Sequence, residues 1–332
     1  MPFIFILILS CFGPGLAHGG TVMDYLKNYN RPKETPYPKA NPYNKSKEQL
    51  GKALFYDPRL SSSNWFSCSS CHKPTLNWED GLRQGLGHQK SHPERSTPTL
   101  LDAAWGELMY WDGRAENLEN LVLAELQSPY GMNQNLDALM QKLKRISGYK
   151  SAFSKAFPDK PLRPPLVAAA IATFVRSLRS SPAPFDQWVS GDGKVISESA
   201  QRGFLIFNEK GRCAQCHSSW RFSDNQFHDI GLDTDDLGRG KILEGVDRFQ
   251  HAFKTPTLRN IEYRAPYMHN GSLKFLSNVI DFYDQGGQVK RPSKSPHIKP
   301  LELNFQEKSD LINFLKTLSS PIKPETLPVL PQ

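Results

Sequence analysis

The sequence has few apolar residues and no long apolar run. Only 38% of its 332 residues are hydrophobic, and apolar runs such as residues 3–9 are far shorter than the roughly 20 residues that a helix needs to span a bilayer. The basic excess, 41 Lys and Arg against 33 Asp and Glu, is spread along the chain rather than clustered. We therefore expect no integral membrane segment in the mature chain and no nucleic-acid partner. Charged residues at 22% and aromatic residues at 11% still indicate a folded protein.

The amino-terminal segment lacks charge, since no charged residue precedes Asp24. Its apolar run is followed by the small-residue triplet Gly-Leu-Ala at residues 15–17, which is typical of an export signal. We expect residues 1–17 to be a signal peptide and the protein to be periplasmic. A buried core segment is one alternative. In another, residues 8–11 act as a lipoprotein cleavage box and Cys11 carries the lipid.

Cysteine is also scarce, but four of the five cysteines form two identical Cys-x-x-Cys-His motifs, at residues 68–72 and 213–217. Two thiols separated by two residues can bind both vinyl groups of one haem, and the following histidine can then ligate the iron. The motifs predict two covalently bound haem c groups. The residues involved are Cys68, Cys71 and His72, and then Cys213, Cys216 and His217. A four-cysteine zinc site, or two disulfides or redox pairs, would use the same thiols but would leave the repeated histidine unexplained.

The two motifs lie 145 residues apart, which indicates one haem in each of two domains. Residues 18–44 are polar and rich in proline, so we expect an extended amino-terminal arm. The Ser-Ser-Pro-Ala-Pro stretch at residues 180–184 marks a boundary. It separates an amino-terminal domain, residues 45–180, from a carboxyl-terminal domain, residues 181–332.

Apolar periodicity predicts helices and no convincing strand. Ser46 is the expected N-cap of a helix before the first motif. Further helices are expected at about 116–127, 135–146, 164–179, 199–208 and 309–318. The predicted fold is mostly α, with two cytochrome-c-like domains, each around one covalent c-type haem, and long loops.

The sequence resembles the bacterial dihaem cytochrome c peroxidase and MauG family. Besides the haem motifs, the resemblance rests on Leu-Phe-Tyr-Asp-Pro-Arg-Leu-Ser at 54–61, Thr-Pro-Thr-Leu at 97–100, Trp-Asp-Gly-Arg at 111–114, Phe-Lys-Thr-Pro-Thr-Leu-Arg-Asn at 253–260 and Ala-Pro-Tyr-Met-His-Asn-Gly at 265–271. It implies a peroxide-reacting haem in the amino domain and an electron-transfer haem in the carboxyl domain. It also implies one Ca²⁺ between the domains.

The resemblance also implies ligands for the two irons. His88 stands where peroxidases of this family keep a histidine that can ligate the first iron; His92 is a nearby alternative, and a surface-loop histidine is the other interpretation. Tyr283 stands where those peroxidases have methionine, as in the MauG branch. A tyrosine ligand favours ferric and higher-valent iron. Met268 is the remaining methionine candidate, and a packing role is the alternative for Tyr283.

Three further positions match the family by resemblance. Trp111 corresponds to the tryptophan between the haems, which can share an oxidising equivalent between the irons. For Ca²⁺, Ser96 replaces the usual asparagine, and the carbonyls of Arg264 and Pro266 match the other protein ligands.

The chain also departs from the family. Gly131 precedes Met-Asn where the family has a proton-shuttling glutamate, and Leu121 replaces a pocket glutamine; Glu125 is the candidate to reach in from a neighbouring turn. Gly211 stands where MauG has a surface tryptophan, and Trp220 is the nearest substitute.

The resemblance and Tyr283 favour a MauG-like oxidoreductase that activates hydrogen peroxide and oxidises a partner protein through long-range electron transfer, with tryptophan modification as one such reaction. The alternatives are a cytochrome c peroxidase supplied with electrons by a small cytochrome or cupredoxin, and a non-enzymatic dihaem electron carrier or sensor.

Overall fold

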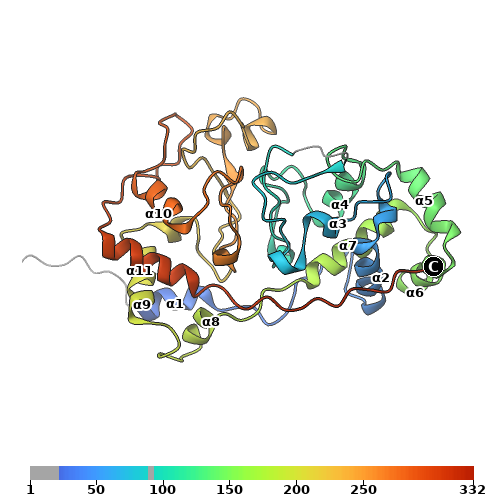
Figure 1. The fold of residues 1–332 in the computed structure, drawn as a ribbon, viewed down its shortest axis with the longest axis horizontal. Helices are drawn as coiled ribbons and strands as arrows, with labels where there is room; N and C mark the ends of the chain where they lie inside the picture. The colour runs from blue at the N-terminus through green and yellow to red at the C-terminus, as the bar shows by residue number, and fades with distance from the viewer. Residues whose placement is uncertain (1–21, 89–92) are drawn as a thin grey trace, which may run out of the picture.

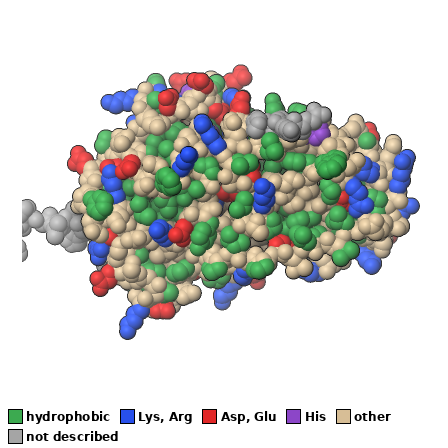
Figure 2. Space-filling view, viewed as in Figure 1, with side chains coloured by type: hydrophobic (Ala, Val, Ile, Leu, Met, Phe, Trp, Pro, Cys, Tyr) green, Lys and Arg blue, Asp and Glu red, His purple; other side chains and the backbone are tan. Residues whose placement is uncertain are grey.

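The computed structural model describes residues 22–88 and 93–332, and it is mostly helical. The expected export signal, Cys11 and His92 lie outside these residues. Two groups of helices lie side by side, joined and covered by long loops (Figure 1). None of the helices in the described part of the chain is long and apolar enough to cross a membrane. On the face shown in Figure 2, Lys and Arg are scattered among apolar and acidic side chains.

The amino-terminal half is built on a pair of packed helices, α2 and α7. Its helices are α2 (Lys45–Tyr56), α3 (Cys68–Cys71), α4 (Leu118–Gln127), α5 (Leu136–Arg145), α6 (Ser147–Ala156) and α7 (Pro164–Ser177). The N-cap of α2 is Asn44 and not Ser46, because the Asn44 side chain accepts hydrogen bonds from the backbone N–H groups of Ser46 and Lys47. The predicted cap was therefore wrong by two residues, although the helix is present.

The carboxyl-terminal half packs α9 against α11 around an aromatic core. Its helices are α8 (Pro184–Val189), α9 (Glu198–Asn208), α10 (Leu276–Asp284) and α11 (Phe305–Lys316). Helix α11 begins four residues before the predicted start, because Asn304 and Glu307 form a capping box there. Strands β1 (Phe227–His228) and β2 (Phe253–Lys254) form a two-residue antiparallel pair, too short for alternation to predict. The core includes Phe185, Phe204, Phe207, Phe222 and Phe314.

Short 3₁₀ helices connect these elements. They are η1 (Lys27–Tyr29), η2 (Pro58–Leu60), η3 (Pro74–Leu76), η5 (Ala103–Trp105), η6 (Cys213–Gln215), η7 (Arg239–Lys241), η8 (Asp247–Phe249) and η9 (Ile261–Tyr263).

Each end of the chain packs on the half formed by the other end. The arm begins as helix α1 (Val22–Leu26) and η1, and Tyr29 is buried there against Phe185 while its hydroxyl donates to Asn208. After α11 the chain runs back along the molecule to α6 (Figure 1). There the carbonyl of Gln332 accepts a hydrogen bond from the Gly148 N–H at 2.8 Å. The two halves are therefore tied together at both ends.

Candidate haem-binding site

The two Cys-x-x-Cys-His motifs have matching local geometry. Each lies on a short helical turn, α3 for the first motif and η6 for the second. The Nδ1 atom of His72 lies 2.9 Å from the carbonyl oxygen of Trp78, and that of His217 lies 2.8 Å from the carbonyl oxygen of Phe222. A proton on Nδ1 that is donated to a carbonyl leaves Nε2 as the free, metal-binding nitrogen. Both motifs therefore fit a haem iron.

The cysteines do not fit the alternative sites. The four thiols of the motifs are free. Among the described residues, the metal-binding side chains that come together are Cys216, Asp224 and His228, and not the four cysteines. The Asp224 carboxylate accepts a hydrogen bond from His228 at 2.8 Å and, with a smaller contribution from Cys216, raises the pKa of His228 to about 10. The cysteine of this trio belongs to the second haem motif.

A large cavity in the carboxyl-terminal half adjoins the second motif. It encloses about 1600 Å³, including space open to solvent, and its walls include Cys213, Cys216, His217 and Tyr283. The exposed lining is mostly apolar, as a porphyrin requires. Met268 also lies on the wall of this cavity. The cavity therefore fits a haem, and it brings both candidate second ligands to that haem.

Tyr283 lies on α10 with its ring in this cavity. Burial raises its pKa above the ordinary tyrosine value, and Cys216 and Cys213 add to the increase. A phenol that lines a mostly apolar cavity together with Cys213, Cys216 and His217 fits an iron ligand better than a packing role.

The loop that carries His88 runs beside the first motif. The Leu86 carbonyl oxygen lies 3.9 Å from the Cys71 sulfur, and the His88 side chain, two residues further on, is only 7% exposed. Its Nδ1 atom is buried and has no partner among the described residues. Such an atom fits a ligand that meets iron when the haem is bound.

Glu125 lies on α4, which packs in the same apolar cluster as the first motif, because Val122 of α4 belongs to this cluster and Cys68 packs against it. Tyr110 donates a hydrogen bond from its hydroxyl to Glu125 Oε1 at 2.6 Å. The pKa of the Cys68 thiol is raised to about 12, first by burial and then by the Glu125 carboxylate. At Gly131, a Cβ atom would lie only 2.8 Å from Glu125 Oε2. The carboxyl thus occupies space beside the position where the family carries its glutamate.

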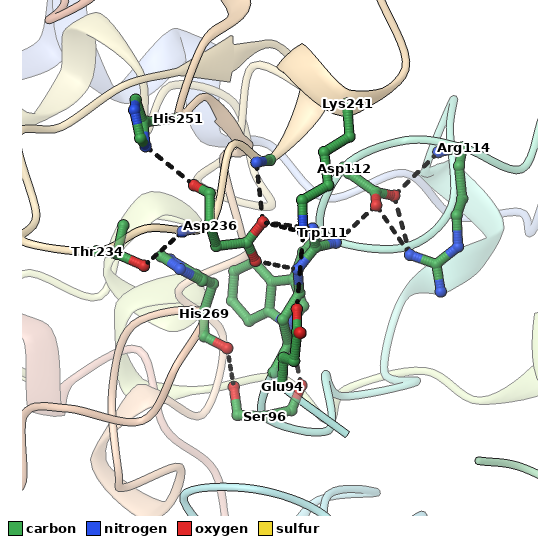
Figure 3. Close-up of polar contacts among 12 residues, drawn as sticks. Glu94, Ser96, Trp111, Asp112, Arg114, Thr234, Asp236, Lys241, His251 and His269 are labelled. Carbon is green, nitrogen blue, oxygen red and sulfur yellow. Dashed lines mark hydrogen bonds and ion pairs between the residues drawn. The ribbon is translucent and has the colours of Figure 1, made fainter. Parts of the chain in front are cut away.

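Trp111 lies where the two halves meet (Figure 3). Its indole N–H donates to the Ser96 carbonyl at 2.9 Å, and its own carbonyl accepts from the backbone N–H of Lys254 at 2.8 Å. The indole lines the large cavity together with His217. This cavity also reaches Asp80, whose charge affects the pKa of His72 in the first motif. Trp111 therefore lies between the second motif and residues that surround the first motif.

Sequence reasoning missed the ion pairs beside Trp111. Arg95 bonds Asp112 of the amino half at 2.6 Å and Asp236 of the carboxyl half at 2.7 Å. Both carboxylates lie near Trp111 (Figure 3). These charges are far apart in the sequence, and no local pattern pairs them. His269 was noted only as part of a motif. It is buried and stacks on Phe253 with ring centroids 3.6 Å apart, and burial lowers its pKa to about 4.

The residues expected at the calcium site are held mainly by other contacts. The Ser96 hydroxyl donates to the carbonyls of Met268 and His269, both at 3.1 Å. The Arg264 guanidinium is paired with the buried carboxylate of Glu79 at 2.7 Å. These side-chain contacts join the two halves. Arg264 and Pro266, whose carbonyls are the expected ligands, line the large cavity together with Ser96.

Gly211, which stands where MauG has a surface tryptophan, has no room for a side chain. A Cβ at Gly211 would lie 2.7 Å from the Ile206 carbonyl oxygen, so a side chain there requires a shift of the backbone. Trp220 is half-buried and packs edge-on against Trp105, with ring centroids 4.8 Å apart. The Arg31 guanidinium lies 5.2 Å from its ring centroid.

Comparison with known proteins agrees with this geometry. Residues 45–194 match the family model described as di-haem cytochrome c peroxidase, and residues 200–319 match that of cytochrome c. The methylamine utilization protein MauG of Methylorubrum extorquens is 46% identical over 91% of this chain and 86% of its own length. The protein of the same name from Methylophilus methylotrophus is 43% identical over 92% of both chains.

A solved structure is also similar over most of the chain. It is that of a MauG-like protein associated with microbial copper homeostasis, with 31% identity, a TM-score of 0.80, and coverage of 88% of this chain and 95% of the other. These matches, together with two equivalent haem-binding motifs, show two haem c groups and a peroxidase-type oxidoreductase. The chain belongs to the dihaem cytochrome c peroxidase and MauG family.

Proposed function

We propose that the protein is a periplasmic oxidoreductase of the MauG branch, which uses hydrogen peroxide to oxidise a partner protein by long-range electron transfer. The observation that carries this proposal is the Tyr283 phenol, which lines the mostly apolar cavity of the second haem motif together with His217. Identities of 46% and 43% to two proteins named for methylamine utilization support a partner protein from that process. Modification of a tryptophan in this partner stays a prediction from the resemblance.

The residues around the two haem motifs would each have a separate role. Haem iron, when bound, supplies the site at which hydrogen peroxide is activated. His72 and His217 each present Nε2 to an iron, because Nδ1 is held by a carbonyl. Tyr283 would supply a phenolate to the second iron, Trp111 would pass electrons between the halves, and Glu125 would move a proton in the first pocket.

The overall reaction balances with electrons from the partner. Hydrogen peroxide takes up two electrons and two protons and forms two molecules of water. The partner protein loses the two electrons, and Trp111 would pass them from the carboxyl-terminal half to the amino-terminal half. The net charge of +8 on this chain favours an acidic partner surface. A calcium ion held by Ser96 and the carbonyls of Arg264 and Pro266 stays a prediction from the resemblance.

The proposal is tested by electron paramagnetic resonance of the ferric protein before and after one equivalent of hydrogen peroxide. We expect two distinct ferric signals, both of which fall together when peroxide is added, because both haems share the oxidising equivalents. Two six-coordinate signals that do not respond to peroxide would contradict the proposal. That result would indicate the non-enzymatic electron carrier or sensor.

His88 favours a second candidate, a cytochrome c peroxidase that reduces hydrogen peroxide with electrons from a small cytochrome or cupredoxin. Its buried, unpartnered nitrogen beside the first motif suits a ligand that leaves iron before peroxide binds. Steady-state peroxide reduction with a reduced small cytochrome separates the two functions. Fast turnover supports the peroxidase, whereas slow turnover with rapid oxidation of a partner protein supports the MauG-type function.

A further inference from the structure

The space at Gly131 is filled by Glu125. A Cβ atom at this position would lie 2.5 Å from the Glu125 carbonyl oxygen and 2.8 Å from Glu125 Oε2, and both distances are too short for real contacts. The turn after α4 causes this approach, because the Met132 N–H donates to the Glu125 carbonyl at 3.0 Å. The φ angle of Gly131 does not lie in the left-handed region. Glycine is therefore needed here for space, and not for its backbone freedom.

Tyr110 holds the other side of the same carboxyl. Its hydroxyl donates to Glu125 Oε1 at 2.6 Å, which leaves Oε2 without a hydrogen-bond partner in the described part of the chain. The Tyr110 ring is fixed in turn, since the Arg114 guanidinium lies 3.4 Å from its centroid. Burial and the Glu125 carboxylate both raise the pKa of Tyr110, so its hydroxyl stays protonated and remains a donor.

Tyr110 also adopts a strained backbone conformation. Its φ of 68° lies in the left-handed region, which an aromatic residue rarely adopts. The next residue is Trp111, whose indole bonds Ser96 at the junction of the two halves. The turn thus points two neighbouring side chains in different directions. Tyr110 points to Glu125, and Trp111 points to the junction of the two halves. Strain of this kind persists where the surrounding contacts determine the conformation.

We propose that Gly131 and Tyr110 together position Glu125 as the proton-transfer group of the first haem pocket, with Gly131 leaving the space and Tyr110 holding Oε1. This inference rests on the proposed function, because it requires a reaction with hydrogen peroxide. Oε2 accepts a proton from one oxygen of the peroxide and returns it to the other. The O–O bond breaks and the second oxygen leaves as water with both protons. The two electrons that the remaining oxygen needs come from the haem protein.

The first test measures the reaction of the ferric holoprotein with hydrogen peroxide by stopped flow over a range of concentrations. Loss of the proton-transfer group in Glu125→Gln is expected to lower the maximum rate about 100-fold or more. For Tyr110→Phe we expect about a tenfold decrease, with an unchanged half-saturating peroxide concentration, because positioning affects bond cleavage and not binding. The double variant, which combines Tyr110→Phe with Glu125→Gln, should have the same maximum rate as Glu125→Gln alone or a higher one. Tyr130→Phe is the matched control and should equal the wild type, since Tyr130 is 58% exposed in the same turn.

The second test combines a rate measurement with a stability measurement that does not depend on catalysis. Gly131→Ala displaces the Glu125 carboxyl and should reduce the maximum rate as much as Glu125→Gln does. In thermal unfolding of the holoprotein, Tyr110→Phe and Glu125→Gln should each lower Tm, and the double variant should lower it by several degrees less than their sum, because the two residues share one contact.

The outcomes separate the two proposals. If the wild type does not react with peroxide, both this inference and the proposed function are wrong. If the wild type reacts while Tyr110→Phe and Gly131→Ala match its rate and the Tm changes are additive, only this inference is overturned. A slowed Tyr110→Phe with non-additive Tm changes supports it.

Discussion

The chemistry of the second haem depends on single side chains. His217 is oriented by one backbone carbonyl, and Tyr283 reaches the same cavity from α10. The family resemblance left Met268 and Tyr283 as competing ligands, and both line the cavity. Tyr283 is favoured, because it stands where the related peroxidases have their methionine ligand and its phenol lines a mostly apolar cavity beside His217.

At the residue scale, we predict that Tyr283→Phe raises the reduction potential of the second haem by on the order of 0.1 V, because an anionic ligand that stabilises ferric iron is lost. Spectroelectrochemical titration of the holoprotein measures this change. The first haem should keep its potential. Tyr263→Phe, at a tyrosine that is 46% exposed, serves as the control and should leave both potentials unchanged. An unchanged second potential in Tyr283→Phe would show that tyrosine is not the ligand.

At the scale of helices, each half contains two helices that are in close backbone contact at a glycine. Gly51 on α2 faces the Ala170 carbonyl of α7, and Gly203 on α9 faces the Asp310 carbonyl of α11. A Cβ atom would lie 1.9 Å and 2.0 Å from these oxygens, so both helix pairs are in backbone contact. Close backbone packing brings the helix that precedes each motif against the rest of its half.

We predict that Gly51→Ala and Gly203→Ala each lower the free energy of unfolding by about 1–3 kcal/mol, because the added methyl group forces the packed helices apart. Urea unfolding followed by circular dichroism measures the change. Gly193→Ala provides a matched control, since no atom lies within 4 Å of its Cβ position, and should leave the stability nearly unchanged. Equal stability of all three variants would contradict the observed helix contact.

At the scale of the whole molecule, the halves are joined by buried charge and by both chain ends. Arg95 links Asp112 to Asp236 beside Trp111, and these bonds lower the pKa of both carboxyls although burial opposes the shift. The arm and the tail each pack on the half at the other end of the chain. The geometry around Trp111 therefore depends on contacts that span the whole sequence.

Because the pKa values of these two carboxyls are lowered in the folded protein, acid should decrease its stability. Stabilisation by Asp112 and Asp236 is fully present above the unfolded-state value of about 3.9 and is lost as the pH falls below it toward their folded-state pKa values. We predict that acid weakens the stabilisation by this network, seen as a smaller free energy of unfolding in urea at pH 3 than at pH 5.

Removal of the arginine should reproduce the effect of acid at neutral pH. We expect Arg95→Gln to cost about 3 kcal/mol of unfolding free energy at pH 7, because two buried carboxylates lose their partner, and to show a weaker further response to acid. Arg145→Gln, at an exposed arginine on α5, is the control and should behave like the wild type. An acid response that is the same in Arg95→Gln and the wild type would rule out this network as its cause.

Several features could be predicted from the sequence because they are local. Helices α4, α5, α7 and α9 lie within about two residues of the predicted ranges, since apolar periodicity and proline positions determine them. Helix α6 was not predicted, and the start of α11 was placed too late, because their ends depend on caps and on packing with the tail. The neighbourhood of Glu125 could be suspected but not established, since it requires the turn at Gly131 to fold back on α4.

The sequence by itself determined the two haem attachments and the family, because each motif consists of five consecutive residues whose chemistry needs no distant partner. The tertiary structure alone decided which carboxyl lies near the first motif, how Arg95 bridges the halves at Trp111, and how the chain ends cross. These features join residues far apart in the sequence, often more than a hundred positions, and no spacing rule selects one such pair from the many that composition allows.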